Sequence, residues 1–94
     1  MSRQDALLDF RMADGSRHFA EAPWRQARAL RRRLGATPGA TVTAFVDGAA
    51  ESWIEFEYAG HAFGAHNPLN DYWLFVHDPA CPEAVLRDVV RRLA

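Results

Sequence analysis

The residues with the broadest chemistry in this 94-residue chain are its single cysteine, Cys81, and three of its four histidines, His61, His66 and His77. Cys81 stands just before a predicted helix, where unpaired backbone N–H groups favour a thiolate, and His77 lies four residues upstream as a candidate base. With His61, these two residues form one candidate polar site. Against a reactive thiol, the sequence has no CxxC pair and no identifiable third catalytic residue. We therefore predict that Cys81 fills the corner between a strand and a helix, and we assign no catalytic residue.

The histidines are also candidate metal ligands. His61 and His66 lie on one predicted strand at odd spacing, so their side chains point to opposite faces of the sheet. If residues 67–71 form a simple connection to the next strand, His61 pairs across from His77. That pair supplies two ligands, whereas a zinc site needs three or four. We predict no metal ligands and no cofactor.

All eleven basic residues are arginines, and one predicted helix carries Arg25, Arg28, Arg31, Arg32 and Arg33. Such a cluster is able to contact phosphates. The net charge of −1 and the acidic residues on the predicted sheet argue against a nucleic-acid partner, because proteins of that class carry a basic surface.

The composition is that of a globular domain, with 49% hydrophobic and 24% charged residues, and the length allows one domain over residues 1–94. The chain has no apolar run of about 18 residues, and its N-terminus lacks the apolar segment of a signal peptide. A single cysteine excludes an intrachain disulfide and suits a reducing compartment. We predict a cytoplasmic protein with no membrane partner.

Three consecutive strands are predicted between residues 52 and 79. The first, Ser52–Tyr58, alternates between apolar residues on one face and Trp53, Glu55 and Glu57 on the other. A two-residue turn at positions 59–60 places Phe56 opposite Phe63, so the apolar faces of the first two strands coincide. The third strand, residues 72–77, is apolar on both faces and implies cover on both sides.

The remaining elements follow from periodicity and turn residues. A proline at the start and arginines near the end indicate two amphipathic helices. Residues 17–20 form either a short strand or an irregular lead-in to the first helix. The other predicted strands are residues 5–12 and 41–46, and the predicted helices are residues 23–34 and 82–94.

The resulting order, β-α-β-β-β-β-α, predicts a two-layer α+β domain, with an antiparallel sheet of four to five strands and two helices on one face. This order resembles the TATA-binding-protein-like, or helix-grip, arrangement, and a resemblance of topology implies no function. Between the sheet and the helices we expect a core that contains Leu30, Phe56, Phe63, Leu86 and Val89.

Two strings in the C-terminal half carry a further resemblance. WIEFEYAGHAF spans residues 53–63 and DYWLFVHDPACP spans residues 71–82. They resemble a group of small bacterial proteins of about this length, which share the pattern W-x-x-F-x-Y-x-G-H-x-F followed by Y-W-x-F-V-x-D-P-x-C-P. The resemblance implies no activity and supplies no site residues.

Two helices cover only one face of a sheet, and a simple connection at residues 67–71 places Phe63, Trp73 and Phe75 beneath them. The opposite face then carries an apolar patch larger than soluble monomers usually expose. The residues of this predicted interface are Trp53, Tyr72, Leu74 and Val76.

We therefore expect a non-enzymatic interaction or accessory domain that forms a homodimer through the sheet face, or that binds another protein. Residues 5–19 offer an alternative cover for this face within one chain. The competing expectation is a small enzyme or ligand-binding protein, whose pocket would lie near His61, His77 and Cys81. Convergent polar groups in a cavity would distinguish that class.

Overall fold

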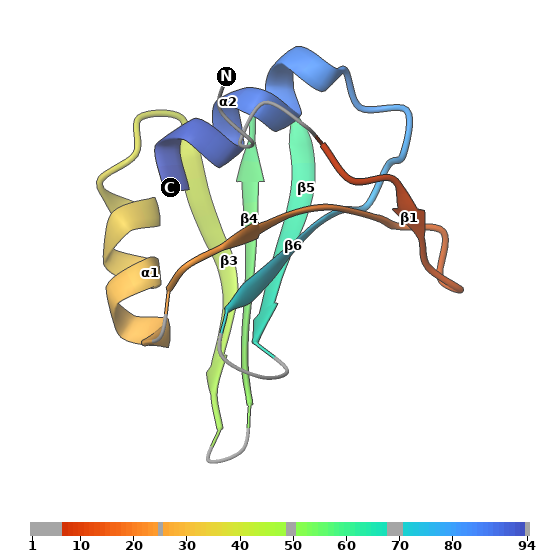
Figure 1. The fold of residues 1–94 in the computed structure, drawn as a ribbon. Helices are drawn as coiled ribbons and strands as arrows, with labels where there is room; N and C mark the ends of the chain where they lie inside the picture. The colour runs from red at the N-terminus through yellow and green to blue at the C-terminus, as the bar shows by residue number, and fades with distance from the viewer. Residues whose placement is uncertain (1–6, 25, 49–50, 68–70, 94) are drawn as a thin grey trace.

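The described part of the chain, residues 7–24, 26–48, 51–67 and 71–93 of a computed structural model, contains an antiparallel sheet of six strands (Figure 1). The strands lie in the order β1 (Phe10–Arg11), β2 (Arg17–Ala22), β6 (Tyr72–Val76), β5 (His61–Asn67), β4 (Ser52–Tyr58) and β3 (Ala40–Asp47). Strands β3 to β6 form a meander of successive antiparallel pairs. The predicted α+β class is confirmed, with one strand more than expected.

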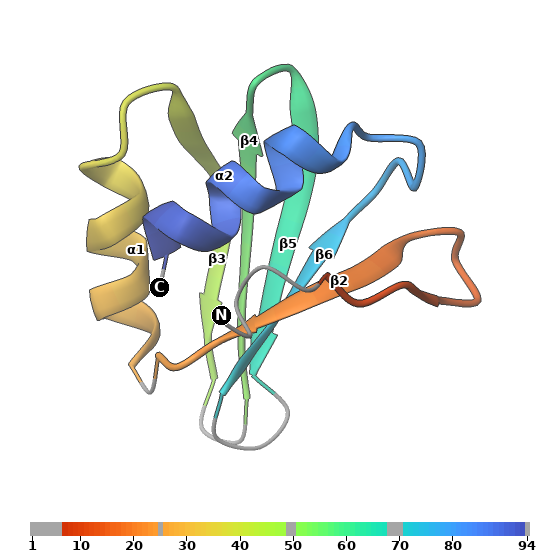
Figure 2. The ribbon, with the colours of Figure 1, turned by 45° about the horizontal axis from the view of Figure 1, so that its top comes forward.

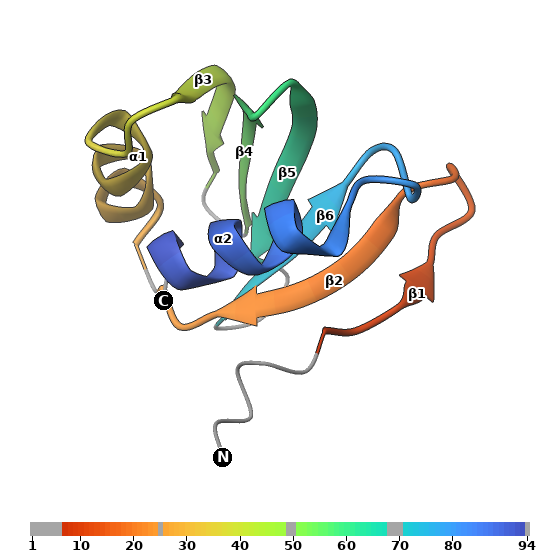
Figure 3. The ribbon, with the colours of Figure 1, turned by 90° about the horizontal axis from the view of Figure 1, so that it is seen from above.

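Two helices pack on the same face of this sheet. Helix α2 (Glu83–Leu93) lies across the curved sheet, and α1 (Ala27–Gly35) lies beside β3 (Figures 2 and 3). The apolar sides of both helices and one face of the sheet form a single core. Residues at helical spacing on α1 and α2 are buried there against alternate residues of the strands. The predicted core residues are all buried there: Leu30, Phe56, Phe63, Leu86 and Val89.

The N-terminal strand is shorter than predicted. Of residues 7–12, only Phe10–Arg11 form a strand, and residues 5–6 lie outside the described part of the chain. A turn follows at once, in which the Met12 backbone N–H donates to the Ser16 carbonyl at 2.9 Å and Gly15 adopts a φ of 91°. Strand β2 then pairs with both β1 and β6, so the ambiguous residues 17–20 belong to a strand.

Helix α1 begins at Ala27, later than the proline at position 23 predicts. The Trp24 backbone N–H donates to the Ala22 carbonyl at 2.9 Å, and Gln26 is extended, with φ −117° and ψ 125°. The indole Nε1 of Trp24 donates to the Leu93 carbonyl at the end of α2, at 2.5 Å. This tertiary contact holds Trp24 in the connection before the helix.

The hairpin between β4 and β5 has the predicted two-residue turn. Phe56 lies opposite Phe63, and Ile54 lies opposite Ala65, so the apolar faces coincide. Ala59 and Gly60 have φ values of 54° and 80°. Two positive φ values are typical of a type I′ turn, which matches the twist of the flanking strands.

The predicted register of β6 is wrong by one residue. A simple connection would pair His61 with His77, whereas the His77 backbone N–H donates to the Ala62 carbonyl at 3.0 Å, and Phe63 lies opposite Val76. A one-residue shift moves every side chain of a strand to the other face. The predicted interface residues Tyr72, Leu74 and Val76 are therefore core residues, at most 1% exposed beneath the helices.

Candidate functional site

A row of aromatic and imidazole rings crosses the helix-free face of the sheet, because residues directly opposite each other on neighbouring strands share a face. Trp53 lies opposite His66, with ring centroids 4.9 Å apart, and His66 lies opposite Trp73. His18 stacks on Trp73 at 4.9 Å and on Phe10 at 5.9 Å. These side chains, from β4, β5, β6, β2 and β1, are called the aromatic row below.

The row ends in exposed apolar groups at both edges of the sheet. Phe10 on β1 is 57% exposed, and Val46, which lies opposite Trp53 on β3, is 60% exposed. Trp53 and Trp73 between them are half-buried. The helix-free face therefore has an exposed apolar side chain at each edge and two half-buried tryptophans between them.

A hollow of about 200 Å³ lies beside the aromatic row. Gly64 leaves this space open, since a Cβ atom there would lie 3.7 Å from Cζ2 of Trp53 and 4.0 Å from Nε2 of His77. The hollow is smaller than a typical ligand pocket of about 300–1,000 Å³ and has room for one side chain or a small fragment. Its lining comes from β4, β5, the end of β6 and the β1–β2 turn: Met12, Asp14, Ser16, Trp53, Gly64, Phe75 and His77.

Carboxylates and imidazoles share this face. Glu55 accepts a hydrogen bond from Nε1 of Trp53 at 2.7 Å, and its other oxygen lies 3.8 Å from Nε2 of His77. Asp14 accepts two hydrogen bonds from Ser16, and these bonds hold the pKa of its carboxyl group below the usual value. Among the residues that the structure describes, no arginine lines the hollow or belongs to the aromatic row.

His18 is the buried member of the row, 4% exposed. Burial lowers the pKa of its imidazole. Two groups oppose this effect in part: the carbonyl of Ala20, whose oxygen lies 3.1 Å from Nε2, and the negative charge of Glu21. Its ring lies between Phe10 and Trp73 and also contacts Phe75 at 5.2 Å. The ring therefore lies as an aromatic spacer between strands, where charging it costs desolvation.

The predicted polar site does not form. His61 lies opposite Tyr58, at the end of the strand face that carries Phe63, whereas His77 lies beside Glu55 on the helix-free face. Cys81 lies in the core between β6 and α2. The one-residue shift of β6 separates the histidines, because it removes the pairing on which their proximity depends.

The Cys81 thiol is 4% exposed, and its hydrogen-bond acceptor is the Pro82 carbonyl, 3.8 Å from Sγ. Burial raises the pKa of the thiol, and the charge of Asp78 raises it further. A thiolate nucleophile needs the opposite shift. The geometry favours the predicted structural role at the strand-to-helix corner.

Within residues 7–24, 26–48, 51–67 and 71–93, no group of three or more His, Cys, Asp or Glu side chains is arranged to hold a metal ion. Neither described helix has the length and apolarity to span a bilayer.

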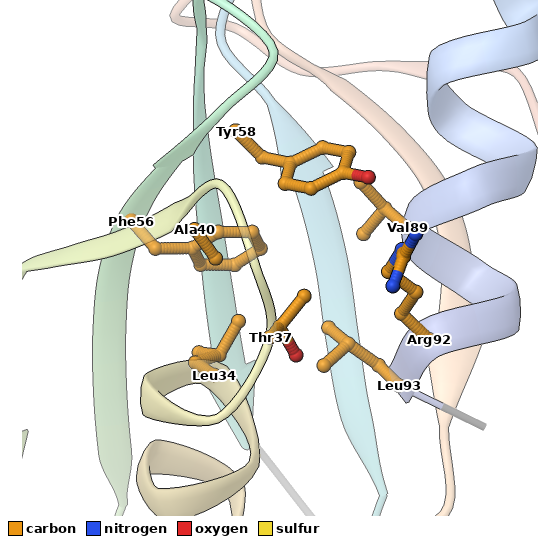
Figure 4. A pocket seen from close by; sticks show the side chains of 8 residues that line it. All are labelled: Leu34, Thr37, Ala40, Phe56, Tyr58, Val89, Arg92 and Leu93. Carbon is orange, nitrogen blue, oxygen red and sulfur yellow. The ribbon is translucent and has the colours of Figure 1, made fainter.

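Figure 4 shows a further hollow, between the end of α1, the end of α2 and strand β4. Its volume is about 10 Å³, the space of a single water molecule. The hydroxyl of Tyr58 points across it and donates to Asp88 on α2. This contact ties the sheet to the helix, and the hollow is a packing defect of the core.

Sequence reasoning missed most of the helix-free face. The register predicted from the sequence places Trp73 and Phe75 in the core, and no sequence pattern predicts a site at Phe10 or His18. The signal in the sequence was the strand at residues 72–77, which is apolar on both faces and therefore predicted cover on both sides. The pairing of His18 with Phe75 joins distant parts of the chain, and no local pattern predicts it.

No family model, curated protein or solved structure matches this chain.

Proposed function

We propose that this protein is a non-enzymatic interaction module, which forms a homodimer through the helix-free face of its sheet. The observation that carries the proposal is the aromatic row. It begins at the exposed Phe10 on β1 and crosses five strands to Trp53 on β4, and the exposed Val46 lies next to Trp53 on β3. Aromatic residues with a polar rim are typical of the centre of a protein interface. The single cysteine, buried and unpaired, supports a reducing compartment such as the cytoplasm.

A second copy is the partner that this face fits best, because the face carries both a projection and a hollow. A two-fold contact brings each residue of one copy to the same surface of the other, so it needs self-complementary features. The exposed ring of Phe10 is the projection, and the space above Gly64 between Trp53 and His77 is the hollow. In the proposed dimer, Phe10 of each copy enters the hollow of its partner.

The charges of the face support the same partner. Its carboxylates include Glu55, and its imidazoles include His66 and His77. A face with both donors and acceptors can pair with a copy of itself, whereas a strongly basic or acidic partner finds no matching single-sign surface here.

Sedimentation velocity of the wild type at micromolar concentrations tests this proposal. We expect a reversible dimer. We expect Phe10→Glu and Val46→Glu each to shift the population to folded monomer, because each variant places a carboxylate in an apolar contact, where its burial costs desolvation. Both side chains are more than half exposed, so the substitutions leave the core intact. Circular dichroism checks that each variant stays folded.

Ala84→Glu is the matched control, because Ala84 is exposed on α2, on the opposite side of the sheet. This variant should dimerise like the wild type. A wild type that stays monomeric over the whole concentration range contradicts the proposal, as does a dimer that tolerates both substitutions on the face.

A further inference from the structure

A second surface lies apart from the helix-free face, in the groove between α1 and the edge strand β3. Its volume is about 750 Å³, within the range of peptide- and ligand-binding clefts. The groove is lined from the helix by Arg28, Arg31, Arg32 and Gly35, and from the strand by Ala40, Thr41, Val42 and Phe45.

Strand β3 forms one edge of the described sheet, with β4 as its neighbour. An edge strand directs alternate backbone N–H and C=O groups away from the sheet, and an extended peptide can pair with them. Several β3 side chains are exposed, including Thr41, Thr43 and Val46. The edge is eight residues long, with a register irregularity between Val42 and Ala44 that divides it into two shorter stretches.

The helix side of the groove is positively charged because of the spacing of its arginines. Ala27, Leu30 and Leu34 face the core. Arg28 follows Ala27 by one position, and Arg32 follows Leu30 by two. Both arginines therefore lie on the side of the helix next to its buried side, and they border the groove. Nε of Arg28 lies 3.7 Å from Oδ2 of Asp47, at the end of β3.

Arg31 and Phe45 give the groove an apolar floor with a positive rim. The guanidinium carbon of Arg31 lies 5.1 Å from the centroid of the Phe45 ring, a cation–π contact that holds the arginine over the strand. Val42 and Phe45 are half-buried at the edge of the core. Among the described residues, no carboxylate is within ion-pair distance of Arg31 or Arg32.

We propose that an extended, acidic segment of a partner protein binds in this groove as an additional strand on β3. Its backbone pairs with the free edge. Its acidic side chains point to the helix side of the sheet, where Arg31 and Arg32 lie, and its alternate apolar side chains point to the other face, beside Ala44 and Val46. The arginines of the groove lie on the helix side of the sheet, away from the aromatic row, and the Val46 end of β3 borders the proposed dimer interface. The inference itself does not depend on the homodimer.

Charge complementarity favours an acidic peptide over a second copy of this chain. In a two-fold dimer, β3 of one copy could pair with β3 of the other as antiparallel strands and form one continuous sheet. Both α1 helices would then lie on the same face of that sheet, one on each side of the β3–β3 junction. The arginines that border the two grooves would then repel each other. A phosphate backbone matches the arginines but makes no use of the strand edge.

The probe for the test is a fluorescein-labelled, eight-residue peptide in which glutamate alternates with valine, titrated into the full-length protein by fluorescence anisotropy. We expect binding that weakens as salt is added, and amide chemical-shift changes concentrated in residues 27–35 and 40–47. The peptide with lysine in place of every glutamate should bind at least about tenfold more weakly.

N-methylation of the peptide tests the strand pairing itself. Because an edge strand pairs with alternate residues, methylating one alternate set of peptide amides should abolish binding, and methylating the other set should leave it. Equal effects of both sets would overturn the proposed strand addition.

The double variant Arg31→Glu/Arg32→Glu tests the charge contacts, with Arg33→Glu as the matched control on the same helix. Arg33 is exposed and lies over the Trp24 ring, 5.5 Å from its centroid, outside the groove lining. The double variant should bind the acidic peptide at least about tenfold more weakly, and the control should bind it like the wild type.

Three results would overturn the proposal: the lysine peptide binding as well as the acidic one, the double variant binding like the control, or a single-stranded oligonucleotide of equal charge displacing the peptide from residues 27–35. The Phe10→Glu variant should still bind the peptide, and this result separates the groove from the dimer interface.

Discussion

His18 shows how the environment of one side chain determines its chemistry. The imidazole is covered by Phe10, Trp73 and Phe75, and this burial holds the pKa of the ring below its ordinary value. A histidine with a lowered pKa binds fewer protons in the folded state than in the unfolded state. His18 therefore makes the folded state more stable at high pH than at low pH. This contribution to the free energy of unfolding is complete above the unfolded pKa of about 6.5, and it is lost as the pH falls below that value towards the lowered native pKa.

The prediction at the residue scale follows from this sign. The urea midpoint of the wild type should fall as the pH is lowered below about 6.5. His18→Phe keeps an aromatic ring in the stack but cannot titrate, so its midpoint should fall less over the same pH range. Chemical denaturation at a series of pH values measures both proteins. An identical pH dependence in the two would show that His18 does not carry the effect.

At the scale of elements, the β4–β5 hairpin combines a favourable register with an unfavourable turn residue. Ala59 has a φ of 54°, in the left-handed region where a Cβ atom clashes with the following carbonyl. The register that pairs Phe56 with Phe63 requires this turn. The burial of two aromatic rings, stacked at 5.3 Å, outweighs the local strain.

Ala59→Gly should therefore raise the free energy of unfolding by about 1 kcal/mol, because glycine adopts a positive φ without the Cβ clash. The control is Ala62→Gly on β5, whose backbone is an ordinary strand and whose side chain is exposed. There, glycine should lower the free energy of unfolding by about 0.5–1 kcal/mol through its greater entropy in the unfolded chain. Urea denaturation measures both changes, and a loss of stability in Ala59→Gly would contradict the turn assignment.

At the scale of the whole molecule, the sheet presents three surfaces with different roles. One face forms the core with α1 and α2, the other carries the aromatic row, and the β3 edge borders the arginine groove. The register of β6 decides which residues belong to the first surface and which to the second. It places Leu74 in the core and leaves Trp73 on the helix-free face.

This division predicts very different costs for two truncations. Leu74→Ala should lower the free energy of unfolding by about 2–5 kcal/mol, because it opens a cavity beneath the helices. Val46→Ala, on the exposed end of the helix-free face, should change it by less than about 0.5 kcal/mol in the monomer. Chemical denaturation at low protein concentration gives both values. A small loss for Leu74→Ala would mean that β6 is paired as the sequence alone suggested.

Local sequence patterns predict those elements whose signal lies within a short stretch of the chain. Alternation placed β4 and the turn at positions 59–60, and helical spacing placed Leu30, Leu34, Leu86 and Val89 on buried stripes. These signals are reliable because one face of each element is clearly more apolar than the other, so only one orientation buries it.

The orientation of β6, the position of His18 and the start of α1 depend on contacts between segments that are distant in the sequence. Residues 72–76 are apolar on both faces, so two registers bury comparable side chains and the local pattern cannot choose between them. The choice depends on contacts with distant segments: Phe63 opposite Val76, His18 opposite Phe75, and the Trp24 indole on the Leu93 carbonyl. Such contacts form only when the chain has folded, and they separate the candidate histidines and assemble the aromatic row.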